Sequence, residues 1–319
     1  MDPITHGIIG LGLSTLSGEP VNSLNPLMLG SVIGAMAPDV DIVFRLKGQY
    51  EYLKHHRGIT HSIVGISFIS IAISVVLNLI FRDYSFFRIF IWTFLGSLSH
   101  SVFDMLNSYG ARFLLPFTKK KISASLLMLF DPVIIFLSLG MVFLFKDIFM
   151  KEIVFSLIFA IYLLFRIHMR SNVAKVLYNN FKNKCIIEKI NILPSFFNPL
   201  KWDFIVETKD SNIVGQVYFL NKKVTIRRKL KKVNHKIIKQ FYKTELGRYF
   251  SEFTPIKHVK VIDKGEEIIL RIIDLRYYLR NEFMHHATAV FNLEKKMVRT
   301  IFHPYSLRRE ILVEEKEIA

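Results

Sequence analysis

The chain contains almost no cysteine. Cys185 is the single cysteine among 319 residues, so no internal disulfide can form, and this fits a reducing compartment for the part of the chain around it. Glycine and proline, with 15 and 10 residues, are not enriched, and the sequence has no low-complexity tract or structural repeat. These absences exclude a disulfide-stapled scaffold and a fibrous or repeat architecture.

Acidic residues are scarce relative to basic ones, and the imbalance is uneven along the chain. The whole sequence carries 43 Lys and Arg against 26 Asp and Glu. Residues 1–170 hold 14 basic and 10 acidic residues, whereas residues 171–319 hold 29 basic and 16 acidic residues. The first part is mostly apolar, with charges between its apolar runs, and the second part is mixed. We therefore predict an α-helical integral membrane domain over 1–170, followed by a small, basic α+β domain over 171–319.

Two short apolar runs open the first part. Asp2-Pro3 and Asn25-Pro26 each place a capping residue before a proline, which is a pattern that starts helices. The runs that follow, 4–16 and 27–37, are shorter than the ~20 residues that cross a bilayer, so they predict a short helical hairpin. No basic segment precedes the first run, which therefore does not resemble a cleavable signal peptide.

Longer apolar runs predict about four membrane-spanning helices, at 62–81, 87–106, 125–145 and 153–167. The connections 45–61, 82–88, 108–124 and 146–151 carry alternately four and two positive residues. The positive-inside rule then places 45–61, 108–124 and the second domain in the cytoplasm. This predicts a multi-pass protein of the cell membrane, most simply a bacterial inner membrane, with a cytoplasmic C-terminal domain.

The sequence pattern changes beyond residue 172. Segment 172–190 predicts a basic helical linker, and a further helix is expected near 234–250. Strand-like runs follow at 204–207, 215–220, 257–262, 268–273 and 288–292. The charge of this domain suits an anionic lipid surface, where each nearby Lys or Arg contributes about 1 kcal/mol. No nucleic-acid-binding motif is present, so we expect no nucleic-acid partner.

Polar side chains gather at the ends of the apolar runs. His100 and Asp104 are four residues apart, so both project from one helix face. Imidazole with carboxylate is a common ligand pair for Zn²⁺, Mn²⁺ or Fe²⁺. The alternative is a buried histidine that is hydrogen-bonded to an aspartate. An unliganded ion pair is costly in a membrane span, which favours the metal site.

Asp39 and Asp41 follow a proline and are separated by one residue. On an extended or turn backbone both carboxylates point the same way, so both can face a metal cluster. One would ligate or bridge, and the other can orient a histidine. The alternative is that Asp39 caps a helix and Asp41 is solvated.

The segment 55–62 places three histidines and an arginine directly before a long apolar run. His61 begins that run. The adjacent His55 and His56 diverge in most backbones, so we expect one of them to ligate and favour His56. Arg57 has the geometry for a bidentate grip on phosphate, and its alternative role is that of a positive anchor on the cytoplasmic side.

Two further residues are candidates for the same site. His6 lies in Ile-Thr-His-Gly, which matches the Ile-Thr-His-Ser around His61. Asp131 precedes a proline inside an apolar run, so it either caps a restarting helix or faces the site. The predicted topology places all of these candidates at one side of the membrane. The C-terminal histidines, including His285, His286 and His303, lack carboxylates at ligand spacing and are expected to be ordinary residues.

Together these motifs resemble the LexA-regulated, membrane-bound, metal-dependent hydrolase family (YdjM-like). The resemblance covers residues 1–170 and rests on Asp2-Pro3-Ile4-Thr5-His6, Ala37-Pro38-Asp39-Val40-Asp41, His56-Arg57-Gly58-Ile59-Thr60-His61-Ser62, His100-Ser101-Val102-Phe103-Asp104 with Asn107-Ser108-Tyr109-Gly110, and Asp131-Pro132. It implies a hydrolase. The ligand types are also similar to those of zinc-dependent phospholipase C enzymes, which favours a phosphoester substrate.

We therefore predict a membrane-bound hydrolase with two or more divalent ions, zinc before manganese or iron. The predicted metal ligands are His6, Asp39, Asp41, His56, His61, His100, Asp104 and Asp131. Arg57 and Asp41 are the predicted catalytic residues, acting with a metal-activated water on a phosphoester or ester bond of a lipid or lipid-linked substrate. The alternative is a non-enzymatic metal-binding, scaffold or transporter-associated protein. A transporter needs polar residues along the membrane depth, whereas these residues gather at one edge.

Overall fold

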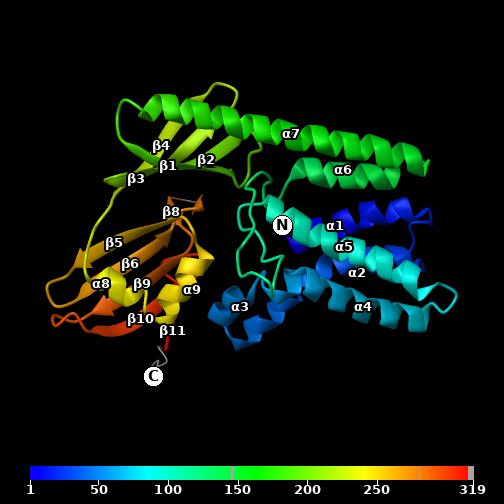
Figure 1. The fold of residues 1–319 in the computed structure, drawn as a ribbon, viewed down its shortest axis with the longest axis horizontal. Helices are drawn as coiled ribbons and strands as arrows, with labels where there is room; N and C mark the ends of the chain where they lie inside the picture. Colours follow the sequence, from blue (N-terminus) through cyan, green and yellow to red (C-terminus); the bar gives the residue numbers. More distant parts are fainter. Residues whose placement is uncertain (145–146, 280, 315–319) are drawn as a thin grey trace. The chain divides into compact units, whose positions relative to one another are not determined.

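The chain folds into two compact units. The computed structural model describes residues 1–144, 147–279 and 281–314 (Figure 1). The first unit comprises Met1–Phe44, His55–Asn172 and Pro194–Pro199, and the second comprises Arg45–Lys54, Val173–Leu193 and the chain from Leu200 onward. The main division falls close to the change in composition near residue 170. Two short segments, 45–54 and 194–199, pack with the unit other than that of their sequence neighbours.

The first unit is helical. Its helices are α1 (Pro3–Ser14), α2 (Pro26–Met36), α4 (Ile63–Ile80), α5 (Phe86–Leu106), α6 (Pro132–Phe143) and the first part of α7 (Ile148–Phe181), with 3₁₀ segments η1 (Thr15–Ser17), η2 (Ala37–Lys47) and η3 (Ile59–His61). Asp2, Asn25 and Asp131 cap α1, α2 and α6, because each side chain accepts hydrogen bonds from backbone N–H groups of the first turn. The predicted helix starts at Asp2-Pro3 and Asn25-Pro26 are confirmed.

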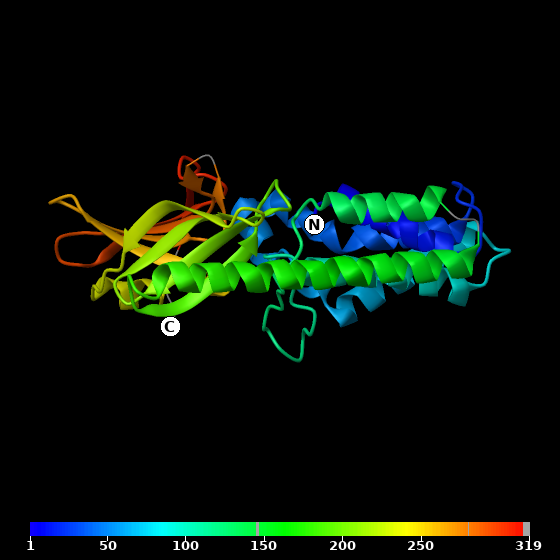
Figure 2. The ribbon, with the colours of Figure 1, turned by 90° about the horizontal axis from the view of Figure 1, so that it is seen from above.

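Within the described residues, four helical segments are long and apolar enough to cross a membrane: Pro26–Lys47, Ile63–Ile80, Phe86–Leu106 and Ile148–Phe181. The predicted span at 125–145 is wrong in length, because the Asp131 cap and Pro132 start α6 late, and α6 then lies beside the longer α7 (Figure 2). Residues before α6 are irregular, and their carbonyl groups at Ala124 and Leu126 accept hydrogen bonds from Arg170 and Arg166. The helix α2 ends at Met36, within one residue of the end predicted for the run 27–37, and the 3₁₀ segment η2 then extends the helical path to Lys47.

Small residues let α2 and α5 approach closely. A Cβ atom at Gly34 would lie 2.3 Å from the Thr93 carbonyl oxygen, and one at Gly96 would lie 2.1 Å from the Ser31 carbonyl oxygen. Ser97 donates a hydrogen bond to the Gly34 carbonyl at 3.0 Å, which ties the two backbones together. The close approach places the C-terminal half of α5 directly against the end of α2.

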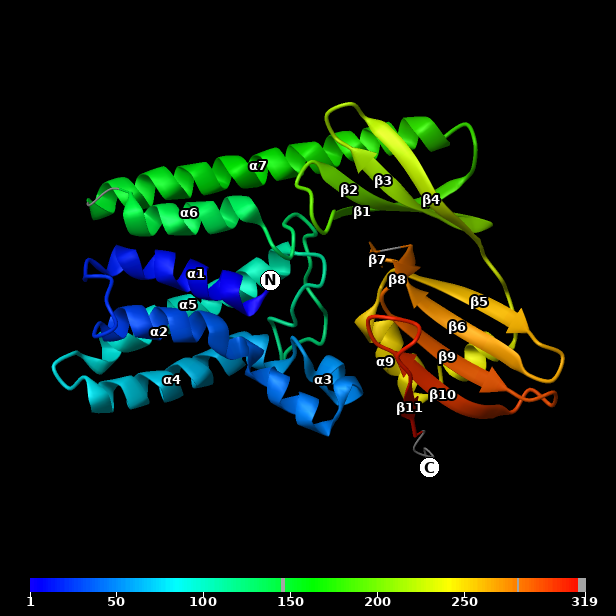
Figure 3. The same cartoon turned by 180° about the vertical axis from the view of Figure 1, so that it is seen from behind.

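The second unit is built mainly from two antiparallel sheets (Figure 3). The first has the order β1-β2-β3-β4, with strands Ile187–Pro194, Lys201–Thr208, Ser211–Tyr218 and Lys223–Lys231. The second has the order β11-β10-β9-β6-β5, with strands Ile311–Val313, Met297–His303, His286–Phe291, Ile268–Asp274 and Lys257–Asp263. A short pair, β7 (Tyr278–Leu279) and β8 (Glu282–Phe283), and the helices α3 (Gln49–His55), α8 (Ile237–Phe241) and α9 (Glu245–Phe253) complete it.

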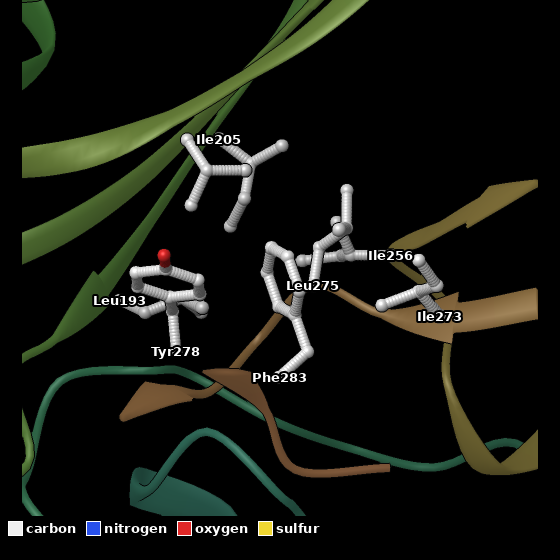
Figure 4. Close-up of a cluster of buried hydrophobic side chains, with 8 residues drawn as sticks. Leu193, Ile205, Ile256, Ile273, Leu275, Tyr278 and Phe283 are labelled. Atoms are coloured by element: carbon white, nitrogen blue, oxygen red, sulfur yellow. The ribbon is translucent and has the colours of Figure 1, made fainter. Parts of the chain in front are cut away.

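Apolar side chains from both sheets form a shared core (Figure 4). Ile205 of β2 and Leu193 of β1 belong to one buried cluster with Ile273 of β6 and Phe283 of β8. The opposite face of the four-stranded sheet packs on the end of α7, where the Phe181 and Phe204 rings lie 6.1 Å apart. The core is therefore continuous from α7 through the first sheet to the second.

Each strand predicted in the second part overlaps an observed one, namely β2, β3, β5, β6 or β9. The predicted helix near 234–250 is two helices, α8 and α9, because the Thr244 hydroxyl accepts from the Gly247 N–H and starts a new helix. The predicted linker 172–190 is helical up to Phe181. His285 and His286, which the sequence predicts to be ordinary residues, are both buried, and burial lowers the pKa of each to about 4, so their rings are neutral at pH 7.

Candidate metal centre

Seven of the predicted ligands converge in the first unit. They form three overlapping groups in which the ligand atoms lie within 4.8 Å of one another: His6, His100 and Asp104; Asp39, His61 and His100; and Asp39, Asp41 and His56. His100 belongs to two groups and so does Asp39, so each can bridge neighbouring positions. The donor set is imidazole and carboxylate, which suits Zn²⁺, Mn²⁺ or Fe²⁺.

His100 is oriented by a backbone carbonyl at the close contact between α5 and α2. Its Nδ1 donates to the Ala35 carbonyl oxygen at 2.7 Å. Because a carbonyl only accepts, the proton stays on Nδ1 and the lone pair stays on Nε2, as in many metal-binding histidines. This Nε2 lies 3.1 Å from Nε2 of His61 and 3.6 Å from Oδ1 of Asp39, so it points into the cluster.

The spacing of the ligand atoms fits a shared ion. Nε2 of His61 lies 3.5 Å from Oδ1 of Asp39 and 3.6 Å from Oδ2 of Asp104. Nε2 of His6 lies 3.5 Å from Oδ1 of Asp104. Two atoms that are each about 2.1 Å from one tetrahedral zinc ion lie roughly 3.4 Å apart, which matches these values.

His6 is the residue whose surroundings best fit a bound metal ion. Its side chain is fully buried and stacks on the His100 ring, with the ring centroids 3.7 Å apart. Neither ring nitrogen has a hydrogen-bond partner among the described residues. A buried polar group in this state costs free energy, and a metal bound by its lone pair would remove that cost. The residues therefore fit the divalent ions that the sequence predicts.

The third group lies where the cluster meets solvent. The side chains of Asp39 and His56 are 17% and 22% exposed, whereas those of His6, His61 and Asp104 are at most 1% exposed. Nδ1 of His56 lies 3.0 Å from both carboxylate oxygens of Asp41, which fixes the proton on that nitrogen. Burial lowers the pKa of His56, so its ring is neutral at pH 7.

Arg57 faces the carboxylates of the cluster. Its Nε lies 3.0 Å from Oδ2 of Asp104, and its Nη1 donates to Oδ1 of Asn107 at 3.2 Å. Its backbone has a φ of 60°, which is uncommon for a residue with a side chain, and its N–H donates to Asp41 at 3.0 Å. The guanidinium is therefore paired with both Asp104 and Asn107 in this structure.

Two of the residues considered from the sequence lie outside the three groups. Asp131 caps α6, and the Tyr162 hydroxyl donates to its carboxylate, lying 3.0 Å from Oδ1 and 2.8 Å from Oδ2. His55 stacks on Phe44 with ring centroids 4.5 Å apart. The structure thus gives Asp131 the capping role that the sequence left open as its alternative, and it places His56 rather than His55 in the cluster.

Comparison with known proteins identifies the first unit. The family described as YdjM inner membrane protein matches residues 1–173, more than half of the chain. The chain belongs to the YdjM inner membrane protein family. An uncharacterized protein of this kind, YfhP from Bacillus subtilis (strain 168), is 28% identical over 297 residues, which is 89% of each chain. Residues 236–310 match the family described as YfhP C-terminal alpha/beta plait domain, and no solved structure matches.

The YdjM-family region also contains a site residue, Asn107, that the sequence indicates as part of a matching motif but to which it assigns no role. Asn107 is fully buried, and its amide donates to Oδ1 of Asp104 at 3.0 Å while its oxygen accepts from Arg57. It therefore links the arginine to the metal-site carboxylate. Its position three residues after Asp104, just past the end of α5, is the signal that could have pointed to it.

Proposed function

We propose that this protein is a metal-dependent hydrolase that acts on a phosphoester or ester bond of a lipid or lipid-linked substrate. The observation that carries the proposal is the chain of three ligand groups joined by His100 and Asp39. Bound divalent ions would lower the pKa of a coordinated water toward ~7 and stabilise negative charge on the substrate oxygen. The family and the apolar helices support a membrane setting for this chemistry.

The protein's own groups can move the protons of such a reaction. Asp41 holds the proton of His56 on Nδ1, so the other ring nitrogen carries a lone pair. That nitrogen can accept a proton from an attacking water and return it to a leaving group. Because His56 is also placed to ligate, these two roles are alternatives for the same side chain. Arg57 and Asn107 would keep Asp104 oriented through both arrangements.

Apolar side chains beside the solvent-facing group support a lipid substrate. Val40, Ile42 and Val43 of η2 are each more than half exposed, and they flank Asp39 and Asp41 in the sequence. Exposed apolar side chains next to polar groups mark surfaces that bind lipids or apolar ligands. An acyl chain on this surface would leave a phosphate or ester group near Asp39.

The test is turnover by the purified full chain in nanodiscs. We expect release of phosphate or alcohol from a member of a panel of phospholipids, lipid phosphates and soluble phosphoesters, with one oxygen of labelled water in the product. Chelation should abolish turnover, and Zn²⁺ or Mn²⁺ should restore it. Asp39→Asn should lower kcat/KM by at least about 100-fold, since it alters two ligand groups. Full metal occupancy with no turnover on the panel would favour a non-enzymatic metal-binding or scaffold protein.

We also propose that the second unit lies in the cytoplasm and contacts anionic lipid headgroups. Strand β4 exposes most of its residues, and its sequence carries five Lys and Arg. A cavity of about 590 Å³ nearby is lined by four lysines: Lys184, Lys209, Lys229 and Lys231. Cys185 lies at the same cavity and offers a test, since it is the single cysteine. A membrane-impermeant maleimide should label it only in lysed cells, and labelling of intact cells would contradict this location.

A further inference from the structure

The segment Arg45–Lys54 belongs to the second unit, whereas the residues just before and after it belong to the first. It follows the metal-site residues Asp39 and Asp41 and precedes His56 and His61, all of which are in the first unit. The segment itself packs with the C-terminal sheets of the second unit. It therefore connects two halves of the candidate metal centre by way of the other unit.

An aromatic cluster anchors the segment there. Tyr50 of α3 is buried, with its ring edge-on to Tyr249 of α9 at 5.1 Å and to Phe302 of β10 at 5.7 Å. Tyr249 and Phe302 also meet each other at 5.8 Å, so the three rings form one contact. Edge-to-face aromatic pairs have a defined geometry, so this cluster fixes the position of α3 as well as burying it.

Polar contacts extend the same docking surface on either side of Tyr50. Nζ of Lys54 lies 2.7 Å from the Glu245 carboxylate, at the start of α9. The Gln49 side chain donates to the Tyr305 hydroxyl at 3.2 Å. Residues at both ends of α3 are thus paired with the C-terminal part of the chain.

The two ends of the segment lead directly to site residues. The residues that flank the segment, Phe44 before it and His55 after it, belong to the first unit and stack on each other. His55 is followed directly by His56. Beyond that stack, Asp41 accepts hydrogen bonds from the His56 ring and from the Arg57 backbone N–H. Because α3 ends at His55, any displacement of this helix would also displace the adjacent His56.

We propose that Tyr50 and Lys54 are positioning residues, through which the C-terminal domain holds Asp41, His56 and Arg57 in the geometry that binds metal at the solvent-facing group. This goes beyond hydrolysis, although it rests on the metal-binding part of the proposed function. It gives the α/β domain a role in the site without contributing a ligand to it. The domain would act on the site through its contacts with the segment 45–54.

The decisive variants are Tyr50→Ala and a charge exchange at Lys54 and Glu245. In the purified full chain, we expect Tyr50→Ala to weaken Co²⁺ binding at the solvent-facing group by about 10-fold or more, the effect typical of outer groups that orient ligands. The Co²⁺ absorption spectrum reports the change in ligand geometry. Amide hydrogen exchange of residues 55–61 should also become faster in the metal-free protein, which measures positioning without metal or turnover.

Controls separate positioning from general unfolding. Tyr50→Phe keeps the ring cluster and should behave as wild type. Lys54→Glu and Glu245→Lys should each weaken Co²⁺ binding, and the double variant should recover most of it, whereas the exposed Lys47→Glu on the same segment should have no effect.

The outcomes distinguish the two proposals. If wild-type protein binds no Co²⁺, the metal-binding proposal fails. If wild type binds Co²⁺ and Tyr50→Ala retains both its affinity and its exchange rates at 55–61, the positioning proposal is overturned while the metal site stands. Failure of the charge exchange to recover binding would likewise count against the Lys54 contact.

Discussion

Replacement of His100 by alanine is expected to remove high-affinity metal binding. His100 belongs to two of the three ligand groups, and its Nε2 is fixed toward them by the hydrogen bond from Nδ1 to Ala35. Changes to outer groups that only orient ligands cost about 10–100-fold in affinity, so loss of a shared ligand should cost at least about 100-fold. Metal content by mass spectrometry and competition with a chelator measure the effect.

Asp104→Asn should also lower metal affinity, and it should in addition destabilise the fold. The Asp104 carboxylate neutralises the buried Arg57 guanidinium as well as facing His6 and His61. Removing one partner of a buried ion pair commonly costs 3–5 kcal/mol, so about that loss in unfolding free energy is expected along with the loss of metal. The matched control is His168→Ala, because His168 is exposed on α7 and bonds only Asn172 among the described contacts. Unchanged metal content in both site variants would refute the metal centre.

Gly96→Ala is expected to force α2 and α5 apart. The added Cβ would lie 2.1 Å from the Ser31 carbonyl oxygen, and the contact atoms are backbone, which cannot rotate away. Overpacking of this kind typically costs about 1–3 kcal/mol, and here it also lengthens the distance from Ala35 to His100. We therefore expect a lower thermal unfolding midpoint together with weaker metal binding.

Gly7→Ala provides the matched comparison. Its Cβ would approach the Met36 sulfur at 3.1 Å, and a methionine side chain can move aside. This variant should keep both stability and metal affinity near wild type. The packing argument would be wrong if Gly96→Ala matched Gly7→Ala in both measurements, or if it lost stability while it kept wild-type metal affinity.

Local signals in the sequence predict much of the first unit. The proline that follows Asp2 or Asn25 marks a helix start, and the i, i+4 spacing of His100 and Asp104 places both on one face, because each pattern depends on neighbouring residues. Asp131 shows the limit of this reasoning. Its carboxylate accepts hydrogen bonds from the start of α6 and from Tyr162. Tyr162 lies 31 residues away, so no local sequence pattern indicates this contact.

Features that depend on distant packing were not predictable in this way. Strand β4 has five Lys and Arg in nine residues, and Arg228 interrupts the apolar alternation of Val224, Ile226 and Leu230, so its pairing with β3 decides its structure. The role of Arg57 likewise depends on Asn107 and Asp104 after the fold has brought them together. The excursion of residues 45–54 into the second unit requires Tyr249 and Phe302, which lie about 200 residues or more along the chain.

The unpartnered nitrogens of His6 have a consequence for biosynthesis. His6 is synthesised before His100 and Asp104, which are made only after α2 and α4 have been completed. No metal position that uses His6 can exist before α5 is in place against α1 and α2. Loading of a metal ion that uses His6 would therefore be a late assembly step, and α1 would carry this imidazole without its ligand-binding partners through all the earlier ones. A cell short of metal would accumulate fully synthesised chains in which His6 binds no metal ion.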